Sequence, residues 1–362
     1  MSRFLAQRYE TLTAYTPGEQ PTDQAYIKLN TNESPFPPSS GVIRAISEEQ
    51  VRDLRLYSDP ECTVLRQKIA TRFGFDKENV FVSNGSDDIL NFSFMAFCDG
   101  KACGVAYPAI SYGFYSVYAD LWHIDKQEIP LLDDFSINPR DYHRLGRTIV
   151  IANPNAPTGR ALLRAEIEGI VRENPDHVVV IDEAYVDFGA ESALELVPKY
   201  DNLLVVRTFS KSYSLAGARL GFAIGQRALI EDLEKIKYST NPYNVNRLTL
   251  LAGAAAMDEN DYYMHNCRII EENRAYLTDA LEALGFAVLP SKANFVFASS
   301  DRIEGEALYR KLKARGILIR HFNKPEIQNY NRITIGTKEQ MQSLVCAIKD
   351  ILTEEKAQEE TL

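Results

Sequence analysis

The chain has 362 residues, of which 45% are hydrophobic and 25% are charged. These fractions are average for folded globular proteins and exclude an intrinsically disordered chain, while the length predicts two domains. The net charge of −10 argues against a nucleic-acid backbone or an anionic membrane surface as partner, although a single cleft can still be basic.

Cysteine usage and hydropathy indicate where the protein works. The five cysteines are scattered and form no Cys-x-x-Cys pair, which is typical of reduced thiols rather than of a disulfide framework or a zinc site. The first ten residues contain no apolar signal-peptide core, and no run approaches the ~18 apolar residues of a membrane helix. We therefore expect a cytoplasmic protein with no nucleic-acid partner, no membrane partner and no metal.

Predicted strands and helices alternate along the first two thirds of the chain. Residues 1–34 are predicted to form an N-terminal arm that leads into a proline-rich loop. Short apolar runs then predict strands over 80–83, 104–107, 148–153, 178–182, 203–208 and 222–225. Helical patterns between them cover 87–98, 110–120, 163–172 and 230–238. This alternation predicts an α/β domain over residues 35–255, with a mainly parallel central sheet flanked by helices.

The last third of the chain has a different pattern. One long helix is predicted over 260–284, because Gly285 follows it and Pro290 comes soon after. Strands are predicted at 294–298, 317–320 and 332–335, with a helix over 305–315. A closing helix has its apolar side chains on one face between 341 and 352. We predict a smaller α+β domain over residues 256–362.

The most specific chemical signal is the segment 208–221, whose sequence is TFSKSYSLAGARLG. Its Lys211 follows the end of an apolar strand, the place where α/β proteins bind ligands. The hydroxyls of Thr208 and Ser210 and the cation of Arg219 are suited to hold a phosphate around this amine. From composition alone, Lys211 would equally be a solvated loop residue.

This segment as a whole resembles the pyridoxal-phosphate lysine signature of the class I and II aminotransferases, which have fold type I. The resemblance implies that Lys211 binds pyridoxal 5′-phosphate covalently and moves a proton between substrate and cofactor. It also implies that Thr208, Ser210 and Arg219 bind the cofactor phosphate. The fold it implies is a large domain with a mainly parallel sheet and a smaller α+β domain.

Asp182 ends a second apolar strand, and Tyr185 follows it. A carboxylate at the end of a buried strand is costly unless a cation or a metal pairs with it. The protonated pyridine nitrogen of the cofactor is such a partner, whereas a metal is disfavoured because no His or carboxylate cluster completes a shell. A helix cap is the remaining alternative for Asp182. The resemblance implies that Tyr185 binds the ring oxygen of the cofactor; taken alone, it would be a core aromatic.

The turn 83–87 joins a strand to a helix, and backbone N–H groups at a helix start suit a phosphate. An aspartate at this place is equally a plain N-cap. The resemblance implies that Gly85, Ser86 and Asp87 hold the cofactor phosphate. It also implies that Tyr112 stacks on the pyridine ring, where composition alone would predict core packing.

One position departs from the family pattern. The turn 153–159, with sequence NPNAPTG, has Ala156 where the family's ring-oxygen asparagine stands. Alanine has no side-chain hydrogen-bond donor. Asn155 or Asn153 would then reach the ring oxygen, or Tyr185 would bind it alone, and we favour Asn155.

Further segments resemble one subgroup of the family, the histidinol-phosphate aminotransferases. The matching segments are 13–18, 29–33, 57–60, 243–246, 293–295 and 332–337. The substrate of this subgroup carries a phosphate dianion and no carboxylate, which two guanidinium groups bind better than one. Arg320 and Arg332 fit these two positions, and Asn32 is expected to contact the substrate.

The resemblance also implies a homodimer with shared active sites. Tyr15 would give a hydroxyl to the substrate phosphate and Tyr57 one to the cofactor phosphate, each from the partner subunit. The implied reaction transfers an amino group between L-histidinol phosphate and 2-oxoglutarate, giving imidazole acetol phosphate and L-glutamate in histidine biosynthesis.

Two other readings of the same residues stay open. A threonine-phosphate decarboxylase or an aromatic amino acid aminotransferase would keep Lys211, Asp182 and Arg219. The aromatic enzyme would need Arg332 but not Arg320, whereas the decarboxylase also needs a phosphate site. The third reading is a non-catalytic protein that binds the cofactor, and the retained lysine, aspartate and arginines argue against it.

Overall fold

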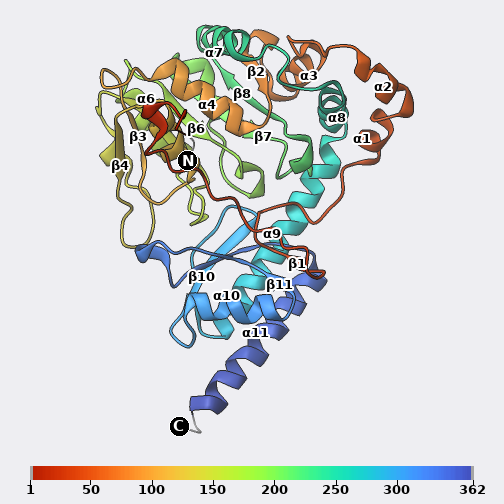
Figure 1. The fold of residues 1–362 in the computed structure, drawn as a ribbon, viewed down its shortest axis with the longest axis vertical. Helices are drawn as coiled ribbons and strands as arrows, with labels where there is room; N and C mark the ends of the chain where they lie inside the picture. Colours follow the sequence, from red (N-terminus) through yellow and green to blue (C-terminus); the bar gives the residue numbers. More distant parts are fainter. Residues whose placement is uncertain (1–2, 360–362) are drawn as a thin grey trace.

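A computed structural model describes residues 3–359 (Figure 1). In this range seven strands form one sheet in the order β2-β8-β7-β6-β5-β3-β4. Their bounds are β2 Val80–Ser83, β3 Val105–Pro108, β4 Lys126–Ile129, β5 Thr148–Ala152, β6 Val179–Asp182, β7 Leu203–Thr208 and β8 Gly221–Gly225. Only β8 runs antiparallel to its neighbours, so the mainly parallel sheet that the sequence predicted is confirmed.

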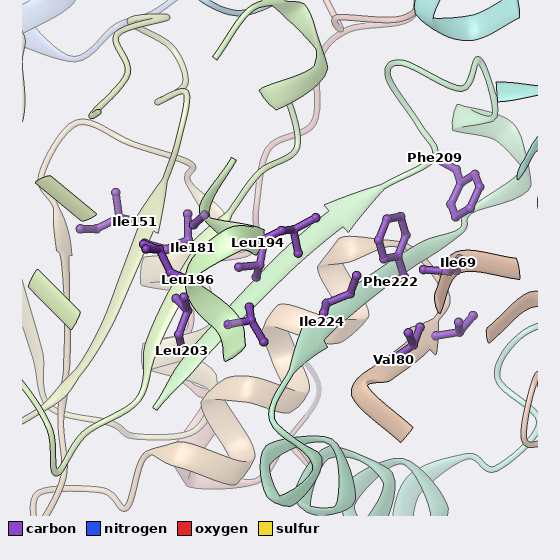
Figure 2. Close-up of a cluster of buried hydrophobic side chains, with 14 of the residues drawn as sticks. Ile69, Val80, Ile151, Ile181, Leu194, Leu196, Leu203, Phe209, Phe222 and Ile224 are labelled. Carbon is purple, nitrogen blue, oxygen red and sulfur yellow. The ribbon is translucent and has the colours of Figure 1, made fainter. Parts of the chain in front are cut away.

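The central strands are apolar on consecutive residues because both faces of the sheet are covered. In β6, Val179 and Ile181 belong to one buried cluster, and Val180 between them belongs to another on the opposite face. Figure 2 shows Ile181 beside Ile151 of β5 and Leu203 of β7, which fill the first cluster. The sheet is therefore the rigid middle layer of an α/β sandwich.

Helices cover both faces of the sheet and extend to one end of it. The helices of this part are α1 Ser40–Ala45, α2 Glu48–Arg52, α3 Thr63–Phe73, α4 Ser86–Phe97, α5 Phe114–Leu121, α6 Arg164–Arg172, α7 Arg227–Thr240 and α8 Arg247–Asp258. The 3₁₀ helices of the described chain are Gln7–Tyr9, Asp53–Arg55, Lys77–Asn79, Pro139–Tyr142, Val186–Phe188, Ala193–Lys199, Ala216–Ala218 and Pro325–Ile327. None of the helices in residues 3–359 combines the length and apolar character that crossing a membrane requires.

A second, smaller sheet has the order β12-β13-β10-β9 and is antiparallel. Its strands are β9 Phe286–Val288, β10 Phe295–Ser300, β12 Arg320–His321 and β13 Asn331–Thr334, with helices α10 Gly305–Ala314 and α11 Lys338–Glu359 beside them. Helix α9, Asn260–Ala283, runs between the two sheets (Figure 1). Its Tyr263 packs in the large core, and its Ile270 and Leu277 pack in the small one.

The N-terminal arm is attached to the smaller sheet region. Strand β1, Ile27–Lys28, pairs in parallel with β11, Ile317–Leu318. Leu29 continues this attachment, because its side chain is buried in the small core. The domain boundaries predicted at 34/35 and 255/256 stay predictions.

Edge strand β4, which the sequence did not predict, lacks a clear apolar pattern, whereas helix α8 was missed although it is apolar. Three of the four residues of edge strand β4 are exposed, so no apolar run marks it. The helix predicted from residue 110 begins at Phe114 instead, because Ile110 to Gly113 form the wall of a cavity.

The close packing of the large core is directly testable. Leu203 is 0% exposed, so Leu203→Ala leaves a cavity and is expected to lower the free energy of unfolding by about 3 kcal/mol. The matched change Leu132→Ala, at a leucine that is 50% exposed, is expected to cost less than about 0.5 kcal/mol. Urea unfolding followed by circular dichroism measures both changes, and equal losses would contradict the packing described.

Candidate active site

Two adjoining cavities lie where strands of the large sheet end. The inner cavity, of about 170 Å³, is formed at the carboxyl ends of β5, β6 and β7 and at the start of α4. The predicted residues that line it are Ser86, Asp87, Tyr112, Asp182, Tyr185, Thr208, Ser210, Lys211 and Arg219. The outer cavity, of about 430 Å³, shares Tyr112, Tyr185 and Lys211 with it and adds the predicted residues Tyr15, Asn32, Arg320 and Arg332. The parallel strands thus bring residues from distant parts of the chain to one place.

The amine of Lys211 lies between the two cavities. Its Nζ donates a hydrogen bond to the carbonyl oxygen of Thr31, at 3.1 Å, and lies 5.9 Å from the ring centre of Tyr185. Burial, together with the positive charge of Arg332, lowers the pKa of Lys211 to about 8. A much larger fraction of this amine is therefore neutral at pH 7 than for an ordinary lysine, and the neutral form is the nucleophile and base.

Asp182 is 4% exposed and has no cation of this chain as partner within residues 3–359. The hydroxyl of Tyr115 donates to its Oδ2 at 2.9 Å, and the N–H of Ala184 donates to its Oδ1 at 3.1 Å. Burial raises the pKa of Asp182 to about 6, although both hydrogen bonds act against that rise. Asp182 is thus a buried carboxylate that faces the cavity and forms no ion pair with a cation among the described residues. Such a carboxylate fits a cationic group of a ligand, such as a pyridinium N–H.

The opposite end of the inner cavity is built for an anion. Gly85 precedes α4 with a φ of +86°, and a Cβ there would lie 2.7 Å from Nη2 of Arg219. Arg219 Nη1 also lies 3.4 Å from the Ser210 hydroxyl oxygen. The first N–H groups of a helix have no partner within the helix. Together with the guanidinium and the hydroxyl they form a cradle that fits a phosphate.

Asp87 acts through its neighbours in this cradle. Its Oδ2 accepts from Arg219 Nη2 at 2.9 Å, and its Oδ1 accepts from the hydroxyl of Tyr112 at 2.8 Å. The carboxylate thus fixes the guanidinium and the aromatic ring at once. Thr208 is similarly internal, since its Oγ1 accepts from the N–H of Ser210 and orients the loop before Lys211.

Tyr185 receives its partner from the N-terminal arm. Asn32 Nδ2 donates to the hydroxyl oxygen of Tyr185 at 2.9 Å. Asn32 is itself fixed, because its N–H and its Oδ1 both bond the Thr334 hydroxyl. The proton of the Tyr185 hydroxyl is then available to an acceptor in the inner cavity.

Asn155 is not brought into either cavity. Its Nδ2 donates to the carbonyl oxygen of Ile110 at 2.9 Å and to the Thr158 hydroxyl at 3.1 Å, and its Oδ1 accepts from Ser111. Ala156, the next residue, lines both cavities instead. The geometry therefore does not support Asn155 as a ligand of the ring oxygen, because both of its amide hydrogens hold the loop together.

The outer cavity holds two guanidinium groups without a carboxylate partner among the described residues. Arg320 and Arg332 lie 5.6 and 5.8 Å from the ring centre of Phe322, and each bonds only one backbone carbonyl oxygen. Nε of Arg332 is buried with no hydrogen-bond partner in that part of the chain. Burial lowers the pKa of Arg332, and the charge of Arg320 adds to this. Two neighbouring cations with unused donors are an anion site.

The two predicted tyrosines of the partner subunit lie in different places. Tyr15 lines the outer cavity of its own chain, because the arm packs its ring on Phe114 with ring centres 4.1 Å apart. Tyr15 is thus in reach of the outer cavity of its own chain, and its contribution from a partner subunit stays a prediction. Tyr57 is 80% exposed, stacks on Tyr243 and lines neither cavity.

Three residues of the site escaped the sequence reasoning. Tyr115 bonds Asp182, Thr31 accepts from Lys211, and Phe322 packs on both arginines. Tyr115 follows Tyr112 by three residues, a spacing that places both on one side of a helical turn and could have flagged it. Thr31 acts through its backbone, which no side-chain pattern reports.

Comparison with known proteins agrees with this geometry. The family model for aminotransferase class I and II matches residues 24–348. The histidinol-phosphate aminotransferase of Brachyspira hyodysenteriae is 50% identical over 353 residues, covering 97% of this chain and 99% of the relative. Histidinol-phosphate aminotransferase 1 of Hydrogenovibrio crunogenus is 49% identical, covering 99% of this chain and all of the relative.

A solved structure has the same fold. The histidinol-phosphate aminotransferase of Sinorhizobium meliloti, crystallised in complex with pyridoxal-5′-phosphate, superimposes with a TM-score of 0.83 at 24% identity, covering 91% of this chain and 92% of that one. The predicted fold type I is confirmed. The chain belongs to the class I and II aminotransferases, a pyridoxal-phosphate-dependent family of enzymes, and within it to the histidinol-phosphate aminotransferases.

Proposed function

We propose that the protein transfers an amino group between L-histidinol phosphate and 2-oxoglutarate, giving imidazole acetol phosphate and L-glutamate. One observation carries the substrate class: Arg320 and Arg332 face the same cavity as the Lys211 amine and lack a carboxylate partner in residues 3–359. A phosphate dianion on the substrate satisfies both cations, whereas a single carboxylate leaves one unpaired. The relatives at 49–50% identity support the same assignment.

The inner cavity is proposed to bind pyridoxal 5′-phosphate, with Lys211, Asp182, Tyr185 and Arg219 as its main ligands. The bound cofactor supplies an electron sink for the electron pair left at a substrate carbon that loses its proton. Asp182 holds the proton on the ring nitrogen, because an ionised buried carboxylate stabilises a cation beside it. Arg219, Ser210 and the start of α4 would bind the cofactor phosphate, and Tyr112 would pack against its ring.

Lys211 is proposed to move the substrate proton. Because its pKa is lowered to about 8, both the protonated and the neutral amine are populated near neutral pH. A group that acts in turn as general base and general acid needs both forms. Arg320, Arg332 and Tyr15 fix the far end of the substrate. This binding holds the reacting carbon near Nζ and replaces water in the cavity.

Amino-group exchange is checked by the visible absorption band of the bound cofactor. Adding L-histidinol phosphate without any keto acid is expected to bleach that band, and adding 2-oxoglutarate is expected to restore it. A band that ignores L-histidinol phosphate but responds to phenylalanine would contradict the substrate and indicate an aromatic aminotransferase. Irreversible release of carbon dioxide from threonine phosphate would indicate the decarboxylase, which also needs a phosphate site.

The phosphate site is tested by Arg320→Gln. Because it removes one charged donor from the substrate phosphate, we expect kcat/KM for L-histidinol phosphate to fall about 100-fold. L-Histidinol, which lacks the phosphate, is expected to react equally slowly with both forms. Arg310→Gln, at an exposed arginine of α10, is the matched control and leaves both rates unchanged. Equal losses on the two substrates would place Arg320 outside the phosphate site.

A homodimer with shared sites is proposed from the exposed surface around Tyr57. Apolar side chains gather on it between residues 43 and 64, and the exposed ones include Ile43, Val51, Leu54, Tyr57 and Val64. An apolar surface of this extent marks an association site, and a two-fold dimer would bury it against its own copy. The dimer would bring Tyr57 to the cofactor phosphate of the partner subunit.

Sedimentation and a complementation experiment check the dimer together. We expect a mass twice the 40.9 kDa of one chain. Tyr57→Phe is expected to weaken cofactor binding about tenfold, since it loses a hydrogen bond to a charged group, whereas Tyr238→Phe on another exposed tyrosine has no effect. Mixing Tyr57→Phe with Lys211→Ala chains is expected to restore one intact site per hybrid dimer. A monomer, or no recovery on mixing, would refute shared sites.

The proposed location is the cytoplasm, as for other enzymes of amino-acid biosynthesis. It is supported by the five cysteines, all of which are free thiols. The proposed domain division, 1–34, 35–255 and 256–362, is supported by the separate cores of the two sheets.

A further inference from the structure

Tyr115 of α5 is a buried residue whose hydroxyl contacts Asp182 in the candidate active site. The residue is 0% exposed, and its hydroxyl donates to Asp182 Oδ2 at 2.9 Å. Its ring lies edge-on to Tyr112, with ring centres 5.7 Å apart, and 5.8 Å from the ring of Tyr107. The aromatic packing fixes the position of the hydroxyl, so the folded core holds the hydrogen bond to Asp182 in place.

Asp182 depends on this contact because few groups stabilise its charge. Among residues 3–359, only the Ala184 N–H donates to its other oxygen. The charged groups with the largest effect on its pKa are also negative: Asp87 at the start of α4 and Glu183, the next residue of the chain, each raise the pKa of Asp182. Arg207 forms an ion pair with Glu183 and not with Asp182. A buried carboxylate with two donors and no cation loses much of its stabilisation when one donor is removed.

We propose that Tyr115 is a positioning residue for the cofactor, which keeps the Asp182 carboxylate ionised and fixed in orientation so that it can hold the proton on the ring nitrogen of pyridoxal 5′-phosphate. This inference rests on the proposed function, since it concerns the same cofactor. Tyr115 does not line either cavity and acts on the cofactor only through Asp182. Through its ring contact with Tyr112 it also supports the aromatic side chain that lies against the cofactor ring.

The test removes one oxygen and keeps the ring. Tyr115→Phe preserves the packing against Tyr107 and Tyr112, and Tyr142→Phe is the matched control. Tyr142 is equally buried in the large core, but its hydroxyl has no partner in residues 3–359. The dissociation constant of pyridoxal 5′-phosphate is measured for each full-length chain by equilibrium dialysis, with the visible band as a second readout. We expect Tyr115→Phe to raise this constant about tenfold and Tyr142→Phe to leave it unchanged.

The pH dependence gives a readout that a packing defect would not move. The Tyr115 hydroxyl favours the ionised form of Asp182, so Tyr115→Phe raises the pKa of that carboxyl above about 6. Binding needs the ionised form, which exists above the pKa, so the loss of cofactor on acidification is expected to begin at a higher pH in this variant.

A double variant decides whether Tyr115 works through Asp182. In the Asp182→Asn background the carboxylate is gone, and Tyr115→Phe is then expected to change the dissociation constant less than about twofold. The same tenfold effect in that background, or no effect of Tyr115→Phe in the native chain, would overturn the inference. Failure of the proposed substrate is distinguishable, because a chain that binds pyridoxal 5′-phosphate normally but ignores L-histidinol phosphate leaves the Tyr115 result intact. A native chain that binds no pyridoxal 5′-phosphate would overturn both.

Discussion

The structure depends on charges that are taken out of water and left without an opposite charge. Asp182, Lys211 and Arg332 all line the joined cavities, and burial shifts the pKa of each toward its neutral form. Leaving such groups unpaired costs free energy that a rigid scaffold must offset. The fully buried strands β5 to β7 and the two apolar cores on their faces provide that scaffold. The site can therefore hold charges of both signs in place for a ligand that complements them.

The N-terminal arm joins the two sheets at the site. It attaches to the smaller sheet region through β1 and through the bonds of Asn32 with Thr334. It then supplies the carbonyl oxygen that accepts from Lys211, and the carbonyl oxygen of Asn30 accepts from Arg332. Lys211 and Arg332 are thus held by one segment, so a displacement of the arm would move both side chains together.

The sequence is most informative where a side chain's own chemistry must be used. Lys211, Asp182 and Arg219 were identifiable because segment 208–221 as a whole resembles the family's lysine signature and Asp182 ends a buried strand, and the structure brings all three to one cavity. The alternating apolar runs predicted most of the large sheet for a similar reason. Contacts made by the backbone, such as the Thr31 carbonyl oxygen, and residues that act on another residue, such as Tyr115, leave no such mark. Asn155 shows the reverse limit, since a suitable donor was present in the sequence but its hydrogens bond the Ile110 carbonyl and the Thr158 hydroxyl.

The alanine at position 156 supplies no hydrogen-bond donor, and other residues supply the donors around it. Ala156 packs in a small apolar cluster with Ala293 and Phe295, and the Tyr185 ring meets Phe295 edge-on at 5.1 Å. A side-chain amide at 156 would place a polar group in that cluster, where it needs a partner. Instead, Asn32 of the arm donates to the Tyr185 hydroxyl oxygen. The proton of this hydroxyl is then free to be donated to an acceptor in the inner cavity. Of the three alternatives raised by the sequence, Asn155 has both amide hydrogens already used, and Tyr185 as the donor to the ring oxygen stays a prediction. The loop 153–159 then forms part of the cavity wall through Ala156, and the arm supplies a polar side chain, Asn32, beside Tyr185.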